Sequence, residues 1–264
     1  MSYQLGVFLQ ITNNKRSEWR KQVEVINNLS GVDFIEIWLE YLPTESEFKF
    51  LKKLIKNYSL NIHAPFIGLN FCSAFPAVNE ASILVMEKLI DCAVKLKAKL
   101  VTYHGGESPF FWSMTKTIKT IKYCISVLSN YGRKKNIKVA IENVTGSKDN
   151  LRIKFPSSLE HLQIIYKSIP KVLFTLDIGH TLQSKENYKP FLKKHIKNIC
   201  HIHLHDGEWG GKAHLEIGKG NFNFKDFFTF LKKIEYNQTI SLEVWGEKVI
   251  RSSWKKIQEI NNRQ

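Results

Sequence analysis

The sequence lacks the features that mark a membrane-spanning, secreted or disulfide-linked protein. No uninterrupted apolar run approaches bilayer-spanning length, and no basic segment followed by an apolar stretch begins the chain, so we expect neither a transmembrane helix nor a signal peptide. The four cysteines (Cys72, Cys92, Cys124 and Cys200) include no CxxC pair. This scatter argues against disulfides or a thiolate zinc site and favours reduced thiols in a cytoplasmic protein.

Acidic residues are scarce relative to basic ones. The chain has 39 Lys and Arg against 24 Asp and Glu, which gives a formal net charge of +15. A basic surface can bind nucleic acid or attract phosphorylated substrates. The lysines are, however, spread over the whole chain, which is also rich in Asn and Ile, so they can equally lie on solvated helix faces. Both interpretations stay open.

Short apolar, β-branched runs alternate with longer amphipathic stretches from end to end of the 264 residues. The length and the 43% hydrophobic content fit one large domain over residues 1–264. Eight strands, each followed by a helix, predict a closed parallel (β/α)8 barrel. A doubly wound sheet would need a Gly-rich first turn, which residues 10–15 lack. The expected strands are Leu5–Gln10, Phe34–Trp38, Leu60–His63, Leu100–His104, Lys138–Glu142, Leu173–Asp177, Cys200–Leu204 and Ile240–Val244, and the expected helices 16–29, 45–57, 77–97, 115–135, 157–168, 186–197, 224–234 and 247–260.

Ionisable side chains stand at the ends of seven consecutive predicted strands. Three long loops, 64–76, 143–156 and 205–223, also follow strands, and the C-terminal strand ends of such a barrel carry its active site. Seven occurrences in a row would be a very odd accident. The residues are Glu36 with Trp38, His63, His104, Glu142, Asp177 with His180, His203 and Glu243.

Strand periodicity agrees with this placement, because alternate side chains of a strand point to opposite faces. Residues two positions earlier should also point into the barrel, and most of them are small or polar: Asn61, Thr102, Ala140, Thr175, His201 and Ser241. The intervening residues are large and mainly apolar, as a helix-facing surface requires: Ile62, Tyr103, Ile141, Leu176, Ile202 and Leu242.

Three carboxylates and an imidazole (Glu142, Asp177, His203 and Glu243) suit a divalent ion such as Mn²⁺, Mg²⁺ or Zn²⁺. Without a cation, these groups would repel one another and would be costly to desolvate. The pattern therefore predicts a metal site on the last four strands.

Other polar residues have plainer interpretations. His161 and His195 fall within helices and are expected at the surface, whereas His201 is expected in the core or supporting a ligand. His205 and Asp206 could simply begin a polar loop, and Glu36 could pair with a Lys across the barrel mouth. Four further histidines could either bind additional metal ions or form hydrogen bonds with substrate hydroxyl groups: His63, His104, His180 and His214.

At these residues the sequence resembles the xylose isomerase-like barrel superfamily, which includes sugar (phosphate) isomerases and epimerases as well as abasic-site nucleases of the endonuclease IV type. The matching segments follow the correct order from the third strand to the eighth. They are His63-Ala-Pro-Phe66, His104-Gly-Gly106, Ile141-Glu-Asn143, Leu176-Asp-Ile-Gly-His180, His201-Ile-His-Leu-His-Asp206, His214-Leu-Glu-Ile-Gly218 and Leu242-Glu243.

The resemblance implies that Glu142, Asp177, His203 and Glu243 bind one divalent metal. In the epimerase branch, carboxylates placed like Glu142 and Glu243 also move the substrate proton, and His180 and Glu36 would hold hydroxyls. In the nuclease branch, His63, His104, His180 and His214 would complete a three-zinc cluster.

One position departs from the nuclease pattern. That branch has an Asp two residues before the histidine that matches His214, where this chain has Lys212, so we expect Lys212 to face a substrate phosphate or carboxylate, or solvent. The loop Gly105-Gly-Glu-Ser108 is also more similar to the isomerases. In favour of the nuclease are the positive charge, the retained histidines and Phe66, which could wedge into DNA.

The leading hypothesis is a metal-dependent isomerase or epimerase of a keto sugar or sugar phosphate, working by Glu-mediated proton transfer through a metal-stabilised enediolate. Its alternatives are an abasic-site DNA phosphodiesterase with a multinuclear zinc site and a non-enzymatic sugar- or metal-binding barrel. The presence of both Glu142 and Glu243 weighs against the binding protein. Four tryptophans near strand ends could stack on a sugar or simply pack at the rim: Trp38, Trp112, Trp209 and Trp245.

Overall fold

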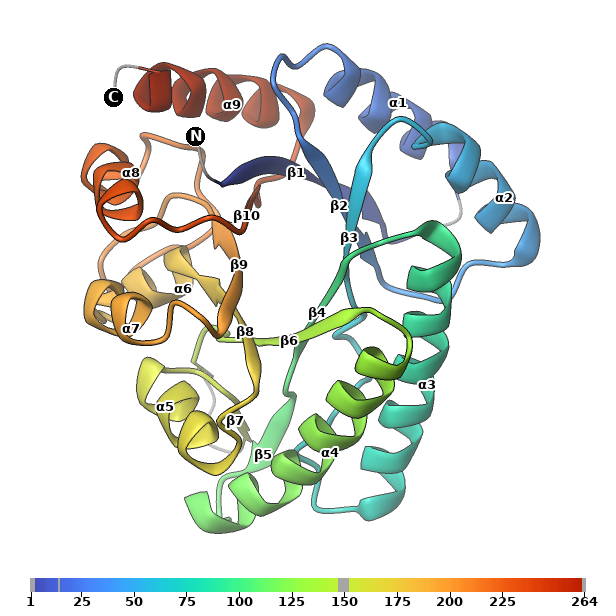
Figure 1. The fold of residues 1–264 in the computed structure, drawn as a ribbon, viewed down its shortest axis with the longest axis vertical. Helices are drawn as coiled ribbons and strands as arrows, with labels where there is room; N and C mark the ends of the chain where they lie inside the picture. The colour runs from blue at the N-terminus through green and yellow to red at the C-terminus, as the bar shows by residue number, and fades with distance from the viewer. Residues whose placement is uncertain (1–2, 14, 147–151, 263–264) are drawn as a thin grey trace.

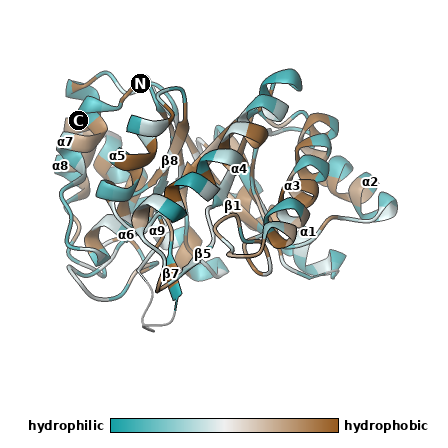
Figure 2. Ribbon diagram, turned by 90° about the horizontal axis from the view of Figure 1, so that it is seen from below, coloured by the Kyte–Doolittle hydropathy of each residue, from teal (hydrophilic) through white to brown (hydrophobic). Residues whose placement is uncertain are grey.

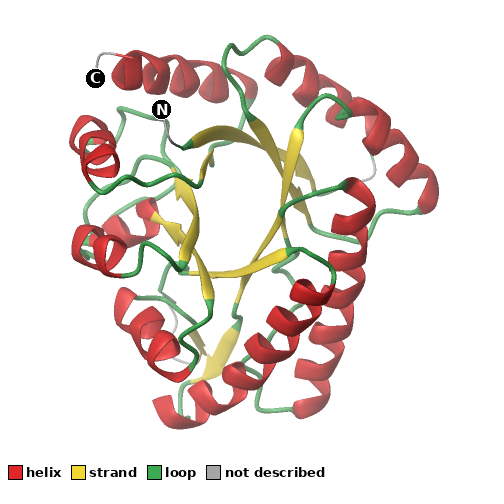
Figure 3. Cartoon of the chain, in the orientation of Figure 1, coloured by secondary structure: helices red, strands yellow, loops and turns green. Residues whose placement is uncertain are grey.

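A computed structural model describes residues 3–13, 15–146 and 152–262 of the chain. Within these residues, eight parallel strands form a closed barrel in the spatial order β1-β10-β9-β8-β6-β4-β3-β2, ringed by helices (Figures 1 and 3). The (β/α)8 prediction is confirmed. The barrel strands are β1 (Gln4–Ile11), β2 (Phe34–Leu39), β3 (Ser59–His63), β4 (Leu100–His104), β6 (Lys138–Glu142), β8 (Leu173–Asp177), β9 (Ile199–Leu204) and β10 (Thr239–Leu242).

The helices lie close to their predicted positions, with one addition. They are α1 (Arg16–Asn27), α2 (Glu45–Leu54), α3 (Pro76–Leu96), α4 (Met114–Lys134), α5 (Leu159–Ser168), α6 (Ile178–Gln183), α7 (Tyr188–Lys194), α8 (Phe224–Lys233) and α9 (Glu247–Asn262). The short α6 was not predicted; it begins directly after β8, where the Asp177 carboxylate accepts the backbone N–H of His180 and caps it. None of the described helices is both long and apolar enough to cross a membrane.

The predicted loop 143–156 contains a short strand that the sequence did not predict. Its residues Arg152–Lys154 form the strand β7, which pairs antiparallel with β5 (Glu107–Pro109) from the loop after β4. This two-stranded ribbon projects from the barrel at the lower edge of Figure 2. The ribbon brings two cationic side chains to the face where the barrel strands end.

The apolar core lies between the strands and the inner faces of the helices. In Figure 2, hydrophobic residues follow the strands and the helix faces turned toward them, while hydrophilic residues lie mostly outside. Ile62, Ile141 and Ile202, predicted to face the helices, are buried in this core. Three of the four cysteines are buried and all four are free thiols, as predicted.

The barrel interior is polar at its centre. The Thr102 and Thr175 hydroxyls, both fully buried, are 2.7 Å apart and share a hydrogen bond. Parallel registers align Thr175 with His201 and Asp177 with His203, so one polar layer lies beneath another. The inward alternation deduced from the sequence is confirmed, and it places the ionisable layer at the C-terminal ends of the strands.

Candidate metal centre and substrate pocket

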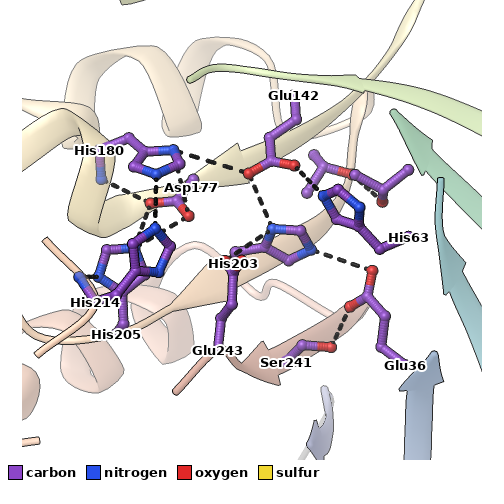
Figure 4. A network of polar contacts seen from close by, with 12 residues as sticks. Glu36, His63, Glu142, Asp177, His180, His203, His205, His214, Ser241 and Glu243 are labelled. Atoms are coloured by element: carbon purple, nitrogen blue, oxygen red, sulfur yellow. Dashed lines mark hydrogen bonds and ion pairs between the residues drawn. The ribbon is translucent and has the colours of Figure 1, made fainter. Parts of the chain in front are cut away.

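Four ionisable side chains from neighbouring strands converge at the mouth of the barrel. Glu142 ends β6, Asp177 ends β8, His203 lies on β9 and Glu243 follows β10. All four are buried, and one nitrogen or carboxylate oxygen from each lies within 4.8 Å of the others. The Nδ1 atom of His203 is 3.0 Å from Glu142 Oε1 and 3.3 Å from Glu243 Oε2 (Figure 4). The structure thus brings together the residues that the sequence grouped.

The electrostatics of this group are unbalanced. Burial, together with the Asp177 and Glu142 carboxylates, raises the pKa of Glu243 well above its usual range despite the neighbouring His203. Burial opposes protonation of His203, yet Glu142, Glu36 and Glu243 raise the pKa of its imidazole well above the usual value. The crowded carboxylates therefore favour protonation of Glu243 and His203, and these protons supply part of the positive charge that a cation would provide.

The donor set fits a divalent cation. Apart from its ion-pair contact with His203 Nδ1 at 3.3 Å, the buried Glu243 Oε2 has no hydrogen-bond partner among the described residues, which is costly for a carboxylate oxygen unless a cation meets it. Three carboxylates and one imidazole match the ligands that Mn²⁺, Mg²⁺ and Zn²⁺ accept. The described residues at this centre therefore suit a single metal ion.

His63 and His104 lie on the outer side of Glu142. Their Nε2 atoms are 3.2 and 3.3 Å from the same oxygen, Glu142 Oε2. His63, Glu142 and His203 also place one donor atom each within 4.8 Å of one another, which would suit a second ion. His104 is partly exposed and lines the cavity described below. The geometry thus keeps both alternatives open for these histidines: additional ligands or substrate-facing donors.

A second group of histidines surrounds Asp177. His205 Nε2 lies 3.1 Å from Asp177 Oδ1, and His180 Nε2 lies 3.2 Å from His214 Nε2. His205 directly follows β9 but is fully buried against Asp177, so it does more than begin a polar loop. Lys212 is exposed and is absent from the described lining of the cavity, so of the two predicted environments it has solvent.

Asp206, the next residue of this loop, is also fully buried and likewise does more than begin a polar loop. Its carboxylate accepts backbone N–H groups from Gly207, Gly218, Gly220 and Phe222 at 2.7–3.2 Å. These bonds gather the loop after β9 around one acceptor and fix the segment that carries His214.

Glu36 does not pair with a lysine across the barrel mouth. It is fully buried inside the barrel, where it contacts His201, His203 and Ser241, and it does not belong to the described cavity lining that would meet a substrate hydroxyl. Glu36 points into the barrel because it lies on the same face of β2 as Trp38. It is one layer deeper in the barrel than Trp38. His201 supports this carboxylate, in agreement with its predicted core position.

The two helical histidines expected at the surface are not there. His195 is 2% exposed, and its ring packs at 4.4 Å on Tyr166 and 4.5 Å on Phe191. His161 is half-buried against Phe155, and its Nδ1 accepts the backbone N–H of Ser157. Phe155 and Phe191 are near these histidines in the sequence, but Tyr166 comes from α5, so the pattern around His195 does not by itself reveal how its ring is covered.

A cavity of about 600 Å³ opens above the metal centre, with Glu243, His63, His104, His180 and His214 in its lining. One wall is aromatic: Trp38 stacks on Phe66 at 5.3 Å, Trp245 stacks on His214 at 5.2 Å, and Phe8 lies beside them. Of the four tryptophans considered, Trp38 and Trp245 line this cavity, whereas Trp112 and the exposed Trp209 do not belong to its described lining.

Sequence reasoning missed two cations of the cavity. Arg152 and Lys154 on β7 line it beside Glu107, and Arg152 Nη1 is 3.0 Å from Glu107 Oε2. The alternation of these two residues with Ile153 could have indicated a short strand. Nothing in the local sequence showed that this segment folds over the barrel mouth.

A parallel barrel with an ionisable cluster and a cavity at its C-terminal face defines an enzyme-type (β/α)8 barrel. The chain belongs to the xylose isomerase-like TIM barrel family, whose family model matches residues 24–261.

Named relatives include sugar epimerases. An uncharacterized protein of Methanocaldococcus jannaschii is 31% identical over 72% of this chain and 74% of its own length. A Haemophilus influenzae protein provisionally named L-ribulose-5-phosphate 3-epimerase is 26% identical over 89% of this chain and 86% of its own. The crystal structure of a D-tagatose 3-epimerase-like protein covers 98% of both chains with 26% identity and a TM-score of 0.83.

Proposed function

We propose that this protein is a divalent-metal-dependent epimerase or isomerase of keto sugars. The observation that carries the proposal is the pair of buried carboxylates, Glu142 and Glu243, which approach the same His203 nitrogen from β6 and β10 beneath a cavity with an aromatic wall. Relatives named as 3-epimerases of L-ribulose or L-ribulose 5-phosphate support the same reaction class.

Glu142, Asp177, His203 and Glu243 would hold the metal. Bound there, a divalent ion supplies Lewis acidity that polarises the substrate carbonyl and adjacent hydroxyl. Glu142 or Glu243 removes the proton from the carbon next to the carbonyl, and the other carboxylate returns a proton to the opposite face or to the neighbouring carbon. One C–H bond breaks and one forms, so the reaction needs no redox partner.

The cavity wall supports a sugar substrate. Trp38, Phe66 and Trp245 present aromatic faces, on which the C–H face of a sugar packs well. His104, His180 and His214 supply polar groups in the same lining, where His104 stacks on Phe66 and His214 stacks on Trp245. Such a pairing of apolar faces and oriented donors is typical of small-molecule sites.

The finer part of the proposal is a phosphate group on the substrate. Lys154 lines the cavity, and no described residue forms a hydrogen bond or ion pair with its side-chain ammonium. Arg152 adds a second cation at the same wall, although Glu107 already partners it. A phosphate at the end of the sugar remote from the metal would meet Lys154, and the net charge of +15 favours an anionic substrate.

Deuterium exchange tests the reaction class. The Mn²⁺-loaded enzyme is incubated in D2O with L-ribulose, D-tagatose and L-ribulose 5-phosphate, and the label is located by NMR. We expect deuterium on the carbon next to the carbonyl, together with the epimer. The variants Glu142→Gln and Glu243→Gln should each lose about 10²- to 10⁴-fold in rate. The control Glu247→Gln removes an exposed carboxylate outside the cavity lining and should retain full rate.

A second candidate, an abasic-site DNA phosphodiesterase, is favoured by one observation. His63 and His104 both contact Glu142, which gives a second group of possible ligands beside the first. The same metal-loaded protein should therefore be offered abasic-site DNA. Strand cleavage at enzymatic rates without exchange on any ketose would replace the epimerase proposal with this one.

A further inference from the structure

Glu36 is a buried carboxylate that the proposed reaction leaves without a task. It is fully enclosed in the barrel, directly beneath His203, and belongs to β2 on the opposite side from the metal-binding strands (Figure 4). A charged carboxylate is costly to bury unless donors surround it. An energetically expensive group held one layer below the metal centre calls for a physical role.

Three donors converge on this carboxylate. Glu36 Oε1 is 3.2 Å from His203 Nε2, and Glu36 Oε2 accepts a hydrogen bond from Ser241 and lies 2.6 Å from His201 Nε2. With the Ser241 hydroxyl and two imidazole nitrogens directed at its two oxygens, the Glu36 carboxylate acts as a hydrogen-bond acceptor.

An acceptor at Nε2 decides the tautomer of His203. When His203 binds a cation its ring is neutral, and the one hydrogen must stay on Nε2 to reach Glu36, which leaves the lone pair on Nδ1. Nδ1 is the atom that faces Glu142 and Glu243 at 3.0 and 3.3 Å. Without Glu36, the hydrogen could equally occupy Nδ1, where it would block a cation and satisfy a carboxylate instead.

We infer that Glu36 is a positioning residue that holds His203 in its Nε2–H tautomer and presents Nδ1 to the metal, while Ser241 and His201 fix Glu36 in turn. The inference rests on the proposed metal-dependent function and extends it to a layer that does not touch substrate. It parallels the support of Asp177, whose carboxylate is contacted by the buried His205. Partners behind a metal ligand orient it and increase its basicity.

Metal affinity, measured without any sugar, tests the inference. Zn²⁺ binding to the purified chain is followed by competition with a chelating dye, and the ¹⁵N resonances of His203 in the Zn²⁺-loaded protein identify which ring nitrogen carries hydrogen. We expect Glu36→Gln to weaken Zn²⁺ binding by about 10- to 100-fold. In the wild type we expect hydrogen on Nε2 and metal on Nδ1. Ser241→Ala, which removes one donor to Glu36, should weaken binding in the same direction by a smaller factor.

The control is Glu47→Gln. Glu47 is 7% exposed but caps α2 through Thr44, and its substitution should lower stability while leaving Zn²⁺ affinity unchanged. Wild-type affinity in a folded Glu36→Gln variant would overturn the inference. Should that variant not fold, an unchanged affinity in Ser241→Ala or coordination of Zn²⁺ through Nε2 would overturn it equally. A wild type that binds Zn²⁺ tightly but exchanges no ketose proton would overturn the proposed function alone.

Discussion

His180 and His214 share one hydrogen between their Nε2 atoms, which lie 3.2 Å apart. His180 Nδ1 donates to the carbonyl oxygen of Asn143 at 2.9 Å, so in the neutral ring its Nε2 is the acceptor and His214 Nε2 is the donor. His214 Nδ1 is then a buried acceptor, and it has no hydrogen-bond partner among the described residues. Burial, with His205 and His180 nearby, lowers the pKa of His214 to about 3, so the ring is neutral at physiological pH.

This arrangement predicts that the third ion of a nuclease-type cluster is missing. Lys212 occupies the place of its carboxylate ligand and is exposed, so we expect one or two Zn²⁺ per wild-type chain after loading with excess metal and desalting. Lys212→Asp should bind an additional ion, because a carboxylate would join the two imidazoles. Lys219→Asp, an exposed control in the same loop, should not change the count from mass spectrometry. Three tightly bound ions in the wild type would contradict the prediction and favour the nuclease.

Asp206 should control the stability of the loop after β9. Asp206→Asn leaves one carbonyl oxygen where two carboxylate oxygens accepted four backbone N–H groups. Since each hydrogen bond to a charged group contributes about 1.5–3 kcal/mol and such losses are not additive, we expect the free energy of unfolding to fall by roughly 2–4 kcal/mol in urea titrations. Asp226→Asn, at an exposed ion pair with Lys189, should change it by less than about 0.5 kcal/mol. Equal effects of the two substitutions would show that Asp206 has no special role.

The contact between the two ends of the chain should be sensitive to alkali. Tyr3 donates to Asn261 Oδ1 at 2.6 Å, and burial raises the pKa of Tyr3 to about 12 although this hydrogen bond opposes the shift. Because the folded pKa exceeds the unfolded value of 10, the stabilisation is complete below pH 10 and is lost as pH rises through 12. The stability advantage of the wild type over Tyr3→Phe should therefore be constant below about pH 9 and decrease above pH 10. A pH-independent difference in urea titrations would contradict this expectation.

Lys154 should distinguish phosphorylated from free ketoses. If its ammonium binds the substrate phosphate, Lys154→Gln should raise KM for L-ribulose 5-phosphate by about tenfold, which corresponds to one charge-assisted hydrogen bond. KM for free L-ribulose should not change. Lys99→Gln, an exposed lysine that precedes β4 at the opposite end of the barrel, is the matched control. A similar change for both sugars, or for neither, would remove Lys154 from phosphate recognition.

The fold and much of the centre could be predicted from the chain because local rules govern them. Period-two alternation decides which side chains point into a barrel, and strand ends of parallel strands meet at one face. These rules placed Glu142, Asp177, His203 and Glu243 correctly near one another. They failed for β7, because it pairs with β5, a segment far from it in the sequence (Glu107 with Lys154), and three residues carry too little periodicity.

The sequence by itself determined the barrel, the inward face of each strand and the chemical types that meet at its mouth. Only the tertiary structure decided how deep each side chain lies in the barrel and which side chains it contacts. Strand tilt and stagger set which side chains share a layer across the barrel. That stagger places Glu36 beneath His203 instead of at the rim. The fold of the loop after β9 leaves Lys212 in solvent, and the pairing of β7 with β5 brings Lys154 to the cavity. Alternation fixes the face of a residue, but its neighbour across the barrel depends on closure of the whole sheet.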